Sequence, residues 1–154
     1  MSRLAFLSPH DADVVGVSPA RHVPSSAFTD VSQLGKLEVR GEVDRLDAIP
    51  LAPGRALVVL EGDVRAERDR LVAEGYRVYD MTAALAALEL DGEDLMRRLT
   101  ELDLDALPAI GSIARGTTAL IERRGGERFR LFVPQELGQF VAEVVNDMAR
   151  GLGR

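Results

Sequence analysis

Residues 112–148 decide the fold class, and they read SIARGTTALIERRGGERFRLFVPQELGQFVAEVVNDM. The β-branched content of 112–122 and the alternation at 128–133 predict two strands. Residues 124–126 between them carry two glycines, which accept the positive φ of a tight turn. From Pro134 onward the apolar residues recur at helical spacing, at Leu137, Phe140, Val141, Val144, Val145 and Met148. A hairpin followed by an amphipathic helix therefore predicts an antiparallel sheet with a helix against one face.

The preceding part of the chain also predicts pairs of strands followed by a helix. Alternation at 36–40 and an apolar run at 55–60 predict two strands, joined by a proline-containing loop at 49–54. Asp63 is a suitable N-cap for a helix ending near Glu74, and another strand is expected at 76–80.

Residues 83–90 are ambiguous, because their Ala and Leu content favours a helix. However, Asp91 and the acidic residues that follow it predict the first turn of a helix at 91–101. A strand at 83–90 therefore fits better between that helix and the strand at 76–80. The resulting order is strand, strand, helix, repeated three times. It predicts an α+β fold of antiparallel sheets with helices on one face, built from split β-α-β (ferredoxin-like) units.

Composition excludes several chemistries. The 154 residues include no cysteine and only two histidines, so thiolate nucleophiles, thiolate metal sites and multi-histidine metal sites are excluded within one chain. The net charge of -6 argues against nucleic acid and anionic membranes as partners. No apolar run approaches the roughly 20 residues of a membrane span, and no signal peptide is recognisable, so a cytoplasmic protein is expected.

Residues 1–29 lack sustained periodicity and predict an irregular N-terminal arm, with residues 30–154 forming a single domain. The arm either docks loosely on its own chain or lies as a strap on another subunit. No catalytic or metal-ligating set is evident. The local basic concentration comprises Arg115, Arg123, Arg124, Arg128 and Arg130. It is either a solvated sheet face balanced by neighbouring glutamates or a contact for an acidic partner or an anionic ligand such as a folate tail.

Residues 30–41, which read DVSQLGKLEVRG, resemble an early signature of the aminomethyltransferase family, the T-protein of the glycine-cleavage system. Residues 57–59, 80–104 and 125–134 resemble later segments of that family in the same order. The resemblance implies a reduced domain of the T-protein folate-binding type over 30–154.

The departures from the family pattern concern its site. The interval 42–55, where the family's catalytic aspartate is expected, is short and lacks its glycine-rich setting, so neither Asp44 nor Asp47 receives that role. Leu60-Glu61 stands where an asparagine is expected, and the family's C-terminal barrel domain has no counterpart. The later folate motif is reduced to Gly125-Gly126-Glu127, which leaves Glu127 and Arg128 as vestigial folate-region candidates.

A chain with this signature and without the site resembles the sarcosine oxidase gamma subunit family. The resemblance implies a non-catalytic structural subunit whose chief partner is the large alpha subunit. It also implies FAD, FMN and NAD on partner subunits, with tetrahydrofolate as the one-carbon acceptor in the oxidative demethylation of sarcosine. The alternative is a stand-alone tetrahydrofolate-binding or aminomethyltransferase-like protein, or a small-molecule-binding regulator, which when isolated could form a homodimer.

Overall fold

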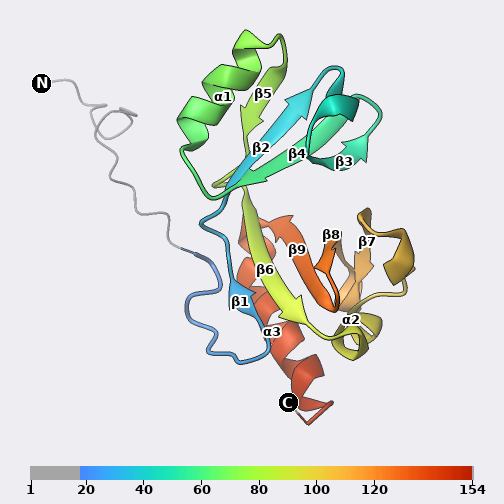
Figure 1. Cartoon of the computed structure of the whole chain (residues 1–154). Helices are drawn as coiled ribbons and strands as arrows, with labels where there is room; N and C mark the ends of the chain where they lie inside the picture. The colour runs from blue at the N-terminus through green and yellow to red at the C-terminus, as the bar shows by residue number, and fades with distance from the viewer. Residues whose placement is uncertain (1–17, 154) are drawn as a thin grey trace, which may run out of the picture.

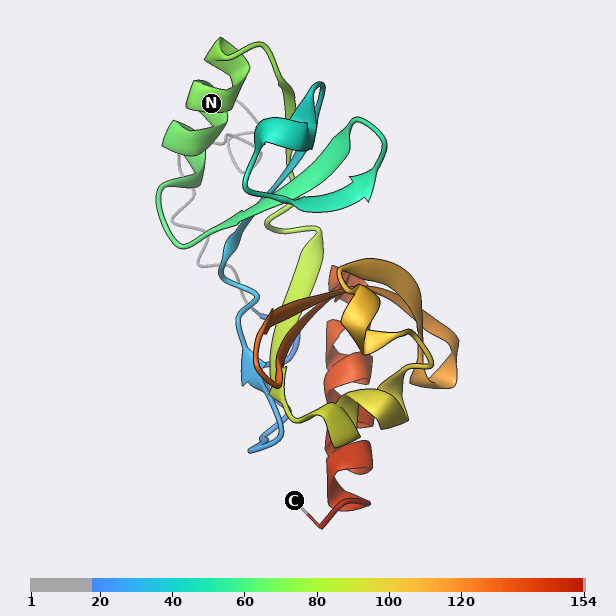
Figure 2. The ribbon, with the colours of Figure 1, turned by 45° about the vertical axis from the view of Figure 1, so that its right-hand side comes forward.

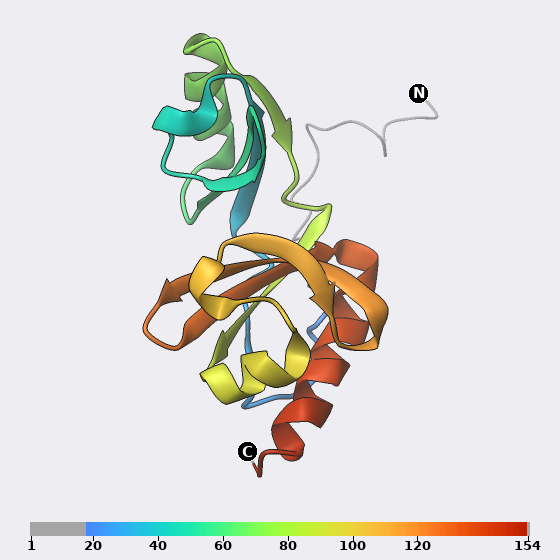
Figure 3. The same cartoon turned by 90° about the vertical axis from the view of Figure 1, so that its right-hand side faces the viewer.

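The computed structural model describes residues 18–153, which form two antiparallel sheets, each with its own helices (Figure 1). The small lobe spans residues 35–80, and the large lobe combines residues 18–30 with 85–153. Figures 2 and 3 show the lobes stacked one above the other, and residues 31–34 and 81–84 connect them. The α+β class and the antiparallel sheets predicted from the sequence are confirmed.

The small lobe has the strand order β3-β4-β2-β5. Its elements are β2 (Gly35–Arg40), β3 (Ile49–Ala52), β4 (Arg55–Leu60), α1 (Val64–Ala73) and β5 (Arg77–Asp80). Because β4 and β5 both pair antiparallel with β2, they run parallel to each other, and β4-α1-β5 is a split β-α-β unit. Its core lies between the sheet and α1 and contains Leu37, Val39, Val43, Ala56, Val58 and Leu71.

The large lobe has the strand order β1-β6-β9-β8-β7. Its elements are β1 (Thr29–Asp30), β6 (Leu85–Asp91), α2 (Glu93–Leu99), β7 (Ala109–Ile113), β8 (Thr117–Gly125), β9 (Arg128–Pro134) and α3 (Gly138–Arg150). Helices α2 and α3 cover one face, where Leu88, Phe129, Ile121 and Val145 are buried.

The described part of the N-terminal arm packs on its own chain. Residues 18–28 contain no helix or strand, yet Ala20 belongs to the large-lobe core. The Asn146 amide of α3 donates to the Pro24 carbonyl oxygen at 3.0 Å, and Pro19 lies against Gly138. This segment is therefore docked on α3, while residues 1–17 of the predicted arm lie outside the described residues.

A third cluster of apolar side chains joins the lobes. Ile49 and Leu57 from the small sheet meet Ala87, Leu120 and Phe132 from the large sheet. These large-lobe residues point away from α2 and α3, since neighbouring strand residues face opposite sides of a sheet. The lobes thus share an apolar contact as well as two connecting segments, residues 31–34 and 81–84.

Three local predictions were wrong. Residues 49–54 contain the edge strand β3, whose position at the end of the sheet tolerates the missing N–H of Pro50. The predicted strand 112–122 is instead a hairpin, because Arg115 and Gly116 have φ of 61° and 79° and turn the chain between β7 and β8. The last helix begins at Gly138, after a short 3-10 turn, and not at Pro134.

The predicted strand at 83–90 and the helices after Asp63 and Asp91 are confirmed, with their ends shifted by one or two residues. In residues 18–153, no helix is both long and apolar enough to cross a bilayer.

Candidate functional site

Three charged side chains form a row across the large sheet, on the face turned toward the small lobe. Arg130 on β9 lies opposite Glu89 on β6 and opposite Glu122 on β8. Its Nε and Nη2 donate to Glu89 Oε1 at 2.9 and 2.5 Å, and its Nη1 donates to Glu122 Oε1 at 3.2 Å. Only 6% of the Arg130 side chain is exposed, so this guanidinium is buried between two carboxylates.

The row is buried because the next row on the same face is the contact between the lobes. Phe132 and Leu120, two residues along β9 and β8, pack against the small lobe and exclude water from their charged neighbours. Burial raises the pKa of Glu122 above its usual value, and the nearby carboxylates of Glu89 and Asp47 act in the same direction. The guanidiniums of Arg130 and Arg124 oppose this shift without cancelling it.

A cavity of about 320 Å³ opens beside this row, where the lobes are joined. Its wall comes from both lobes and the connection between them, namely Val31, Gln33, Leu34, Glu61, Glu89 and Arg130. The volume is at the lower end of the range for small-molecule sites, on the order of 300–1,000 Å³. Carboxylate, amide and guanidinium groups beside two apolar side chains suit a small polar ligand better than an apolar one.

Lys36 lies at the crossing of the two connections between the lobes. Its side chain has no exposed surface, and its Nζ donates to the carbonyl oxygens of Ser32 and Leu34 at 2.7 and 2.8 Å. Its backbone N–H donates to Thr82 Oγ1 at 3.1 Å, and its carbonyl oxygen accepts from the Met81 N–H at 2.8 Å. One residue thus holds both connections.

The electrostatic environment of Lys36 is mixed. The pKa of Lys36 is lowered from 10.5 to about 8, chiefly by burial and to a smaller extent by the nearby guanidinium of Arg130. The carboxylates of Asp80 and Asp30 act in the opposite direction. The amine therefore reaches its neutral form at a pH where an ordinary lysine is charged.

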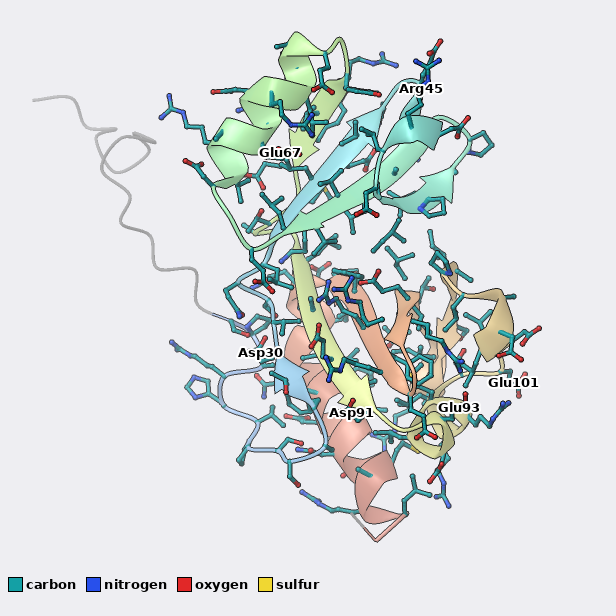
Figure 4. The ribbon with its side chains drawn as sticks, in the orientation of Figure 1. Asp30, Arg45, Glu67, Asp91, Glu93 and Glu101 are labelled. Atoms are coloured by element: carbon teal, nitrogen blue, oxygen red, sulfur yellow. The ribbon has the colours of Figure 1, made fainter. Side chains whose placement is uncertain are left out.

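The two residues singled out from the sequence lie away from the cavity. Glu127 is exposed at the tip of the β8-β9 hairpin, and its carbonyl oxygen accepts from the Gly92 N–H at 2.9 Å. Arg128 is 63% exposed and faces Asp91, with 3.6 Å between Nε and Oδ1. Asp91 lies at the end of β6 farthest from the small lobe (Figure 4). Neither Glu127 nor Arg128 is among the residues that line the cavity.

The remaining arginines of the predicted basic concentration are divided among several neighbours. Arg123 pairs with Glu93 at 2.5 Å, and its guanidinium lies 5.0 Å from the centre of the Phe129 ring. Arg115 pairs with Asp147 at 3.4 Å. Arg128 and Arg130 do lie on one face of β9, as the two-residue repeat predicts. Most of these charges therefore meet an acid of the same chain.

The sequence could not identify Lys36 and Glu89 as site residues. Both belong to strands, but the face they occupy becomes buried only when the lobes meet, and alternation alone assigns charged residues to solvent. For Glu89 the signal was the apolar residue Ala87, which lies two positions earlier on the same face of β6. Lys36 shares its face of β2 with Glu38 and Arg40 and carries no such signal. Among the described residues, no group of three or more His, Cys, Asp or Glu side chains is placed to hold a metal ion.

Comparison with known proteins gives a structural relative. No family model matches the sequence, and no curated protein matches it. A chain of the heterotetrameric sarcosine oxidase from Corynebacterium sp. U-96, solved in complex with pyrrole 2-carboxylate, superposes with a TM-score of 0.66 at 14% sequence identity. The match covers 82% of this chain and 85% of that chain. The two chains therefore have similar lengths and share a fold that includes both lobes.

Proposed function

We propose that this chain is a non-catalytic, gamma-like structural subunit of a heteromeric sarcosine oxidase located in the cytoplasm. The observation that carries the proposal is the shared fold, which extends over 82% of this chain and 85% of a chain of heterotetrameric sarcosine oxidase. Because the match extends over most of both chains, it supports the interpretation that this chain is a whole subunit with the same fold. A motif shared by otherwise unrelated proteins would cover less of each chain. The sequence resemblance to the gamma subunit family independently supports the same assignment.

The proposal assigns the chemistry to the partner subunits. FAD, FMN and NAD would be bound there, with tetrahydrofolate accepting the one-carbon unit from sarcosine, and this chain would pack chiefly against the large alpha subunit. In this chain the buried charged groups are engaged with one another, as in the row of Glu89, Arg130 and Glu122. Such pairing suits a scaffold, because each charge stabilises a defined arrangement of strands.

Co-expression tests the proposal. The tagged chain is produced together with the candidate alpha, beta and delta subunits from the same genome, and the purified material is analysed by size exclusion and mass spectrometry. A stoichiometric complex that oxidises sarcosine, and that loses assembly when this chain is omitted, is expected. A monomer that remains separate while the other subunits assemble into an active oxidase would reject the assignment.

The alternative is a stand-alone tetrahydrofolate-binding or aminomethyltransferase-like protein, which the cavity of about 320 Å³ beside Arg130 favours. Titration calorimetry with tetrahydrofolate decides this alternative. Heat that disappears in Glu127→Gln or Arg128→Gln would place the ligand at the hairpin, whereas loss in Glu61→Gln would place it in the cavity. No heat at high protein concentration rejects folate binding by the isolated chain.

A further inference from the structure

Three arginines form a row across the small sheet, on the face opposite α1. Arg40 on β2 lies directly opposite Arg55 on β4 and directly opposite Arg77 on β5. Residues opposite one another in antiparallel strands point to the same side, with their Cβ atoms about 4.5–5.5 Å apart. The side chains of Arg40 and Arg55 are 38% and 45% exposed, and Arg77 is exposed.

One buried carboxylate holds two of these arginines in place. Glu38 Oε1 accepts from Arg40 Nε at 2.7 Å and from Arg55 Nε at 3.1 Å, and only 10% of its side chain is exposed. Burial opposes its ionisation, but the hydrogen bonds from Arg55 and Arg40 outweigh burial and hold the pKa of Glu38 below its usual value. The Arg40 guanidinium also stacks over the Tyr79 ring, 4.7 Å from its centre.

The resulting patch carries excess positive charge. Arg40 and Arg55 share the single carboxylate of Glu38, and Arg77 adds a third guanidinium to the row, which leaves two positive charges on one face of a chain whose net charge is -6. Like charges directly opposite each other destabilise a sheet, so the row costs folding stability when nothing anionic covers it. Guanidiniums that are already oriented lose less freedom when they bind a carboxylate in two-pronged fashion.

We propose that this arginine patch (Arg40, Arg55, Arg77 and Tyr79) is a docking surface for an acidic segment of a partner protein. The inference deepens the proposed function and rests on it in one respect: the partner would be another subunit of the complex. A polypeptide fits better than a free anion, because Arg77 lies on β5, the strand at one end of the sheet order β3-β4-β2-β5. In the part of the chain that the structure describes, no strand pairs with the outer edge of β5, so a partner strand can add backbone hydrogen bonds there.

A decaglutamate peptide tests the surface on the isolated full chain. The chain has no tryptophan, so tyrosine fluorescence, to which Tyr76 and Tyr79 both contribute, follows the binding of the peptide. We expect binding at low salt that weakens as salt is added. The double variant Arg40→Gln/Arg77→Gln should bind at least about tenfold more weakly, since it removes two guanidiniums that donate charge-assisted hydrogen bonds to the peptide.

The double variant Arg65→Gln/Arg68→Gln is the matched control, since it removes the same charge from exposed positions on α1, on the other side of the sheet. It should retain the affinity of the unmodified chain. Equal weakening in both variants, or no binding by the unmodified chain, would overturn the proposal. Tighter binding of single-stranded DNA or inorganic phosphate than of decaglutamate would also overturn the assignment to an acidic polypeptide.

A second measurement separates a docking role from a structural role. Removing one charge from the row relieves repulsion, so Arg77→Gln should unfold at the same temperature as the unmodified chain or a higher one, while binding decaglutamate more weakly. In co-expression, the same variant should assemble less with the other subunits. If the unmodified chain binds decaglutamate but does not assemble with the other subunits, the oxidase assignment is wrong and the docking surface is retained. If Arg40→Gln/Arg77→Gln assembles as well as the unmodified chain, the docking surface is wrong and the oxidase assignment is retained.

Discussion

Lys36 is the single lysine in a chain with 19 basic residues, and it is the one placed without any exposed surface. An arginine could not replace it easily, because its Nζ donates to two backbone carbonyls only a few residues away. A neutral amine has two N–H donors and can keep both bonds, whereas a guanidinium stays charged at every accessible pH. The position therefore suits a group that can lose its charge.

The pH dependence of stability tests this environment. Because the pKa of Lys36 is about 8 in the folded chain and 10.5 when unfolded, the unfolded chain binds more protons between these values. The free energy of unfolding should therefore rise with pH across that window, by on the order of 3 kcal/mol. Denaturation of Lys36→Met at pH 7, 8.5 and 10 should lack this rise. Parallel pH curves for the two proteins would show that Lys36 titrates normally.

At the scale of the elements, the paired charges across β6, β9 and β8 are mutually dependent. Replacing Arg130 by Met leaves the buried Glu122 and the partly buried Glu89 without their shared cation, and the expected loss is about 3–5 kcal/mol in urea denaturation. Adding Glu122→Gln should recover part of that loss, because one uncompensated charge is removed. A double variant no more stable than Arg130→Met would contradict the coupling.

The start of α1 depends on a single side chain. Asp63 Oδ1 accepts from the N–H groups of Arg65 and Ala66 at 2.9 and 3.1 Å, which satisfies two donors of the first turn. Asp63→Ala should lower the free energy of unfolding by about 1 kcal/mol. Asp69→Ala, an exposed change in the same helix, is the control and should have almost no effect.

The elements that the sequence predicts correctly are those whose position is determined by residues within the element itself. The cap at Asp63 and the stripe of α3 mark their helices from within, and the glycine turn marks the β8-β9 hairpin. The strand β3 and the break at Arg115 escaped prediction. An edge position in the sheet and a positive φ at a non-glycine residue are decided by the partners of the strand and not by its own composition.

The candidate site was less predictable because the surroundings of its residues are formed by segments that are far apart in the sequence. Glu127 and Arg128 are conspicuous in the sequence, yet they lie on the exposed hairpin tip. Lys36, Glu61 and Glu89 are inconspicuous, because their shared surroundings exist only where two lobes and two connections meet. Periodicity reports which face of one element is apolar, and it contains no information on which second element will cover the other face.

At the scale of the whole molecule, the apolar contact between the lobes decides whether they unfold together. Leu57 and Phe132 are 1% and 2% exposed, and they belong to the cluster that draws side chains from both sheets. Each truncation to alanine should cost about 2–5 kcal/mol. The unmodified chain should therefore show one calorimetric transition whose enthalpy equals the van't Hoff value, because neither lobe gains by unfolding alone.

The double variant Leu57→Ala/Phe132→Ala should show two transitions, since it removes one large buried side chain from each sheet of the apolar cluster that joins the lobes. Leu71→Ala is the informative control: it opens a cavity of the same kind beneath α1, inside the small lobe, and leaves the contact between lobes intact. That variant should melt earlier and still in one step. A single transition in the double variant would mean that the hydrogen bonds of Lys36 to both connecting segments couple the lobes without the apolar cluster.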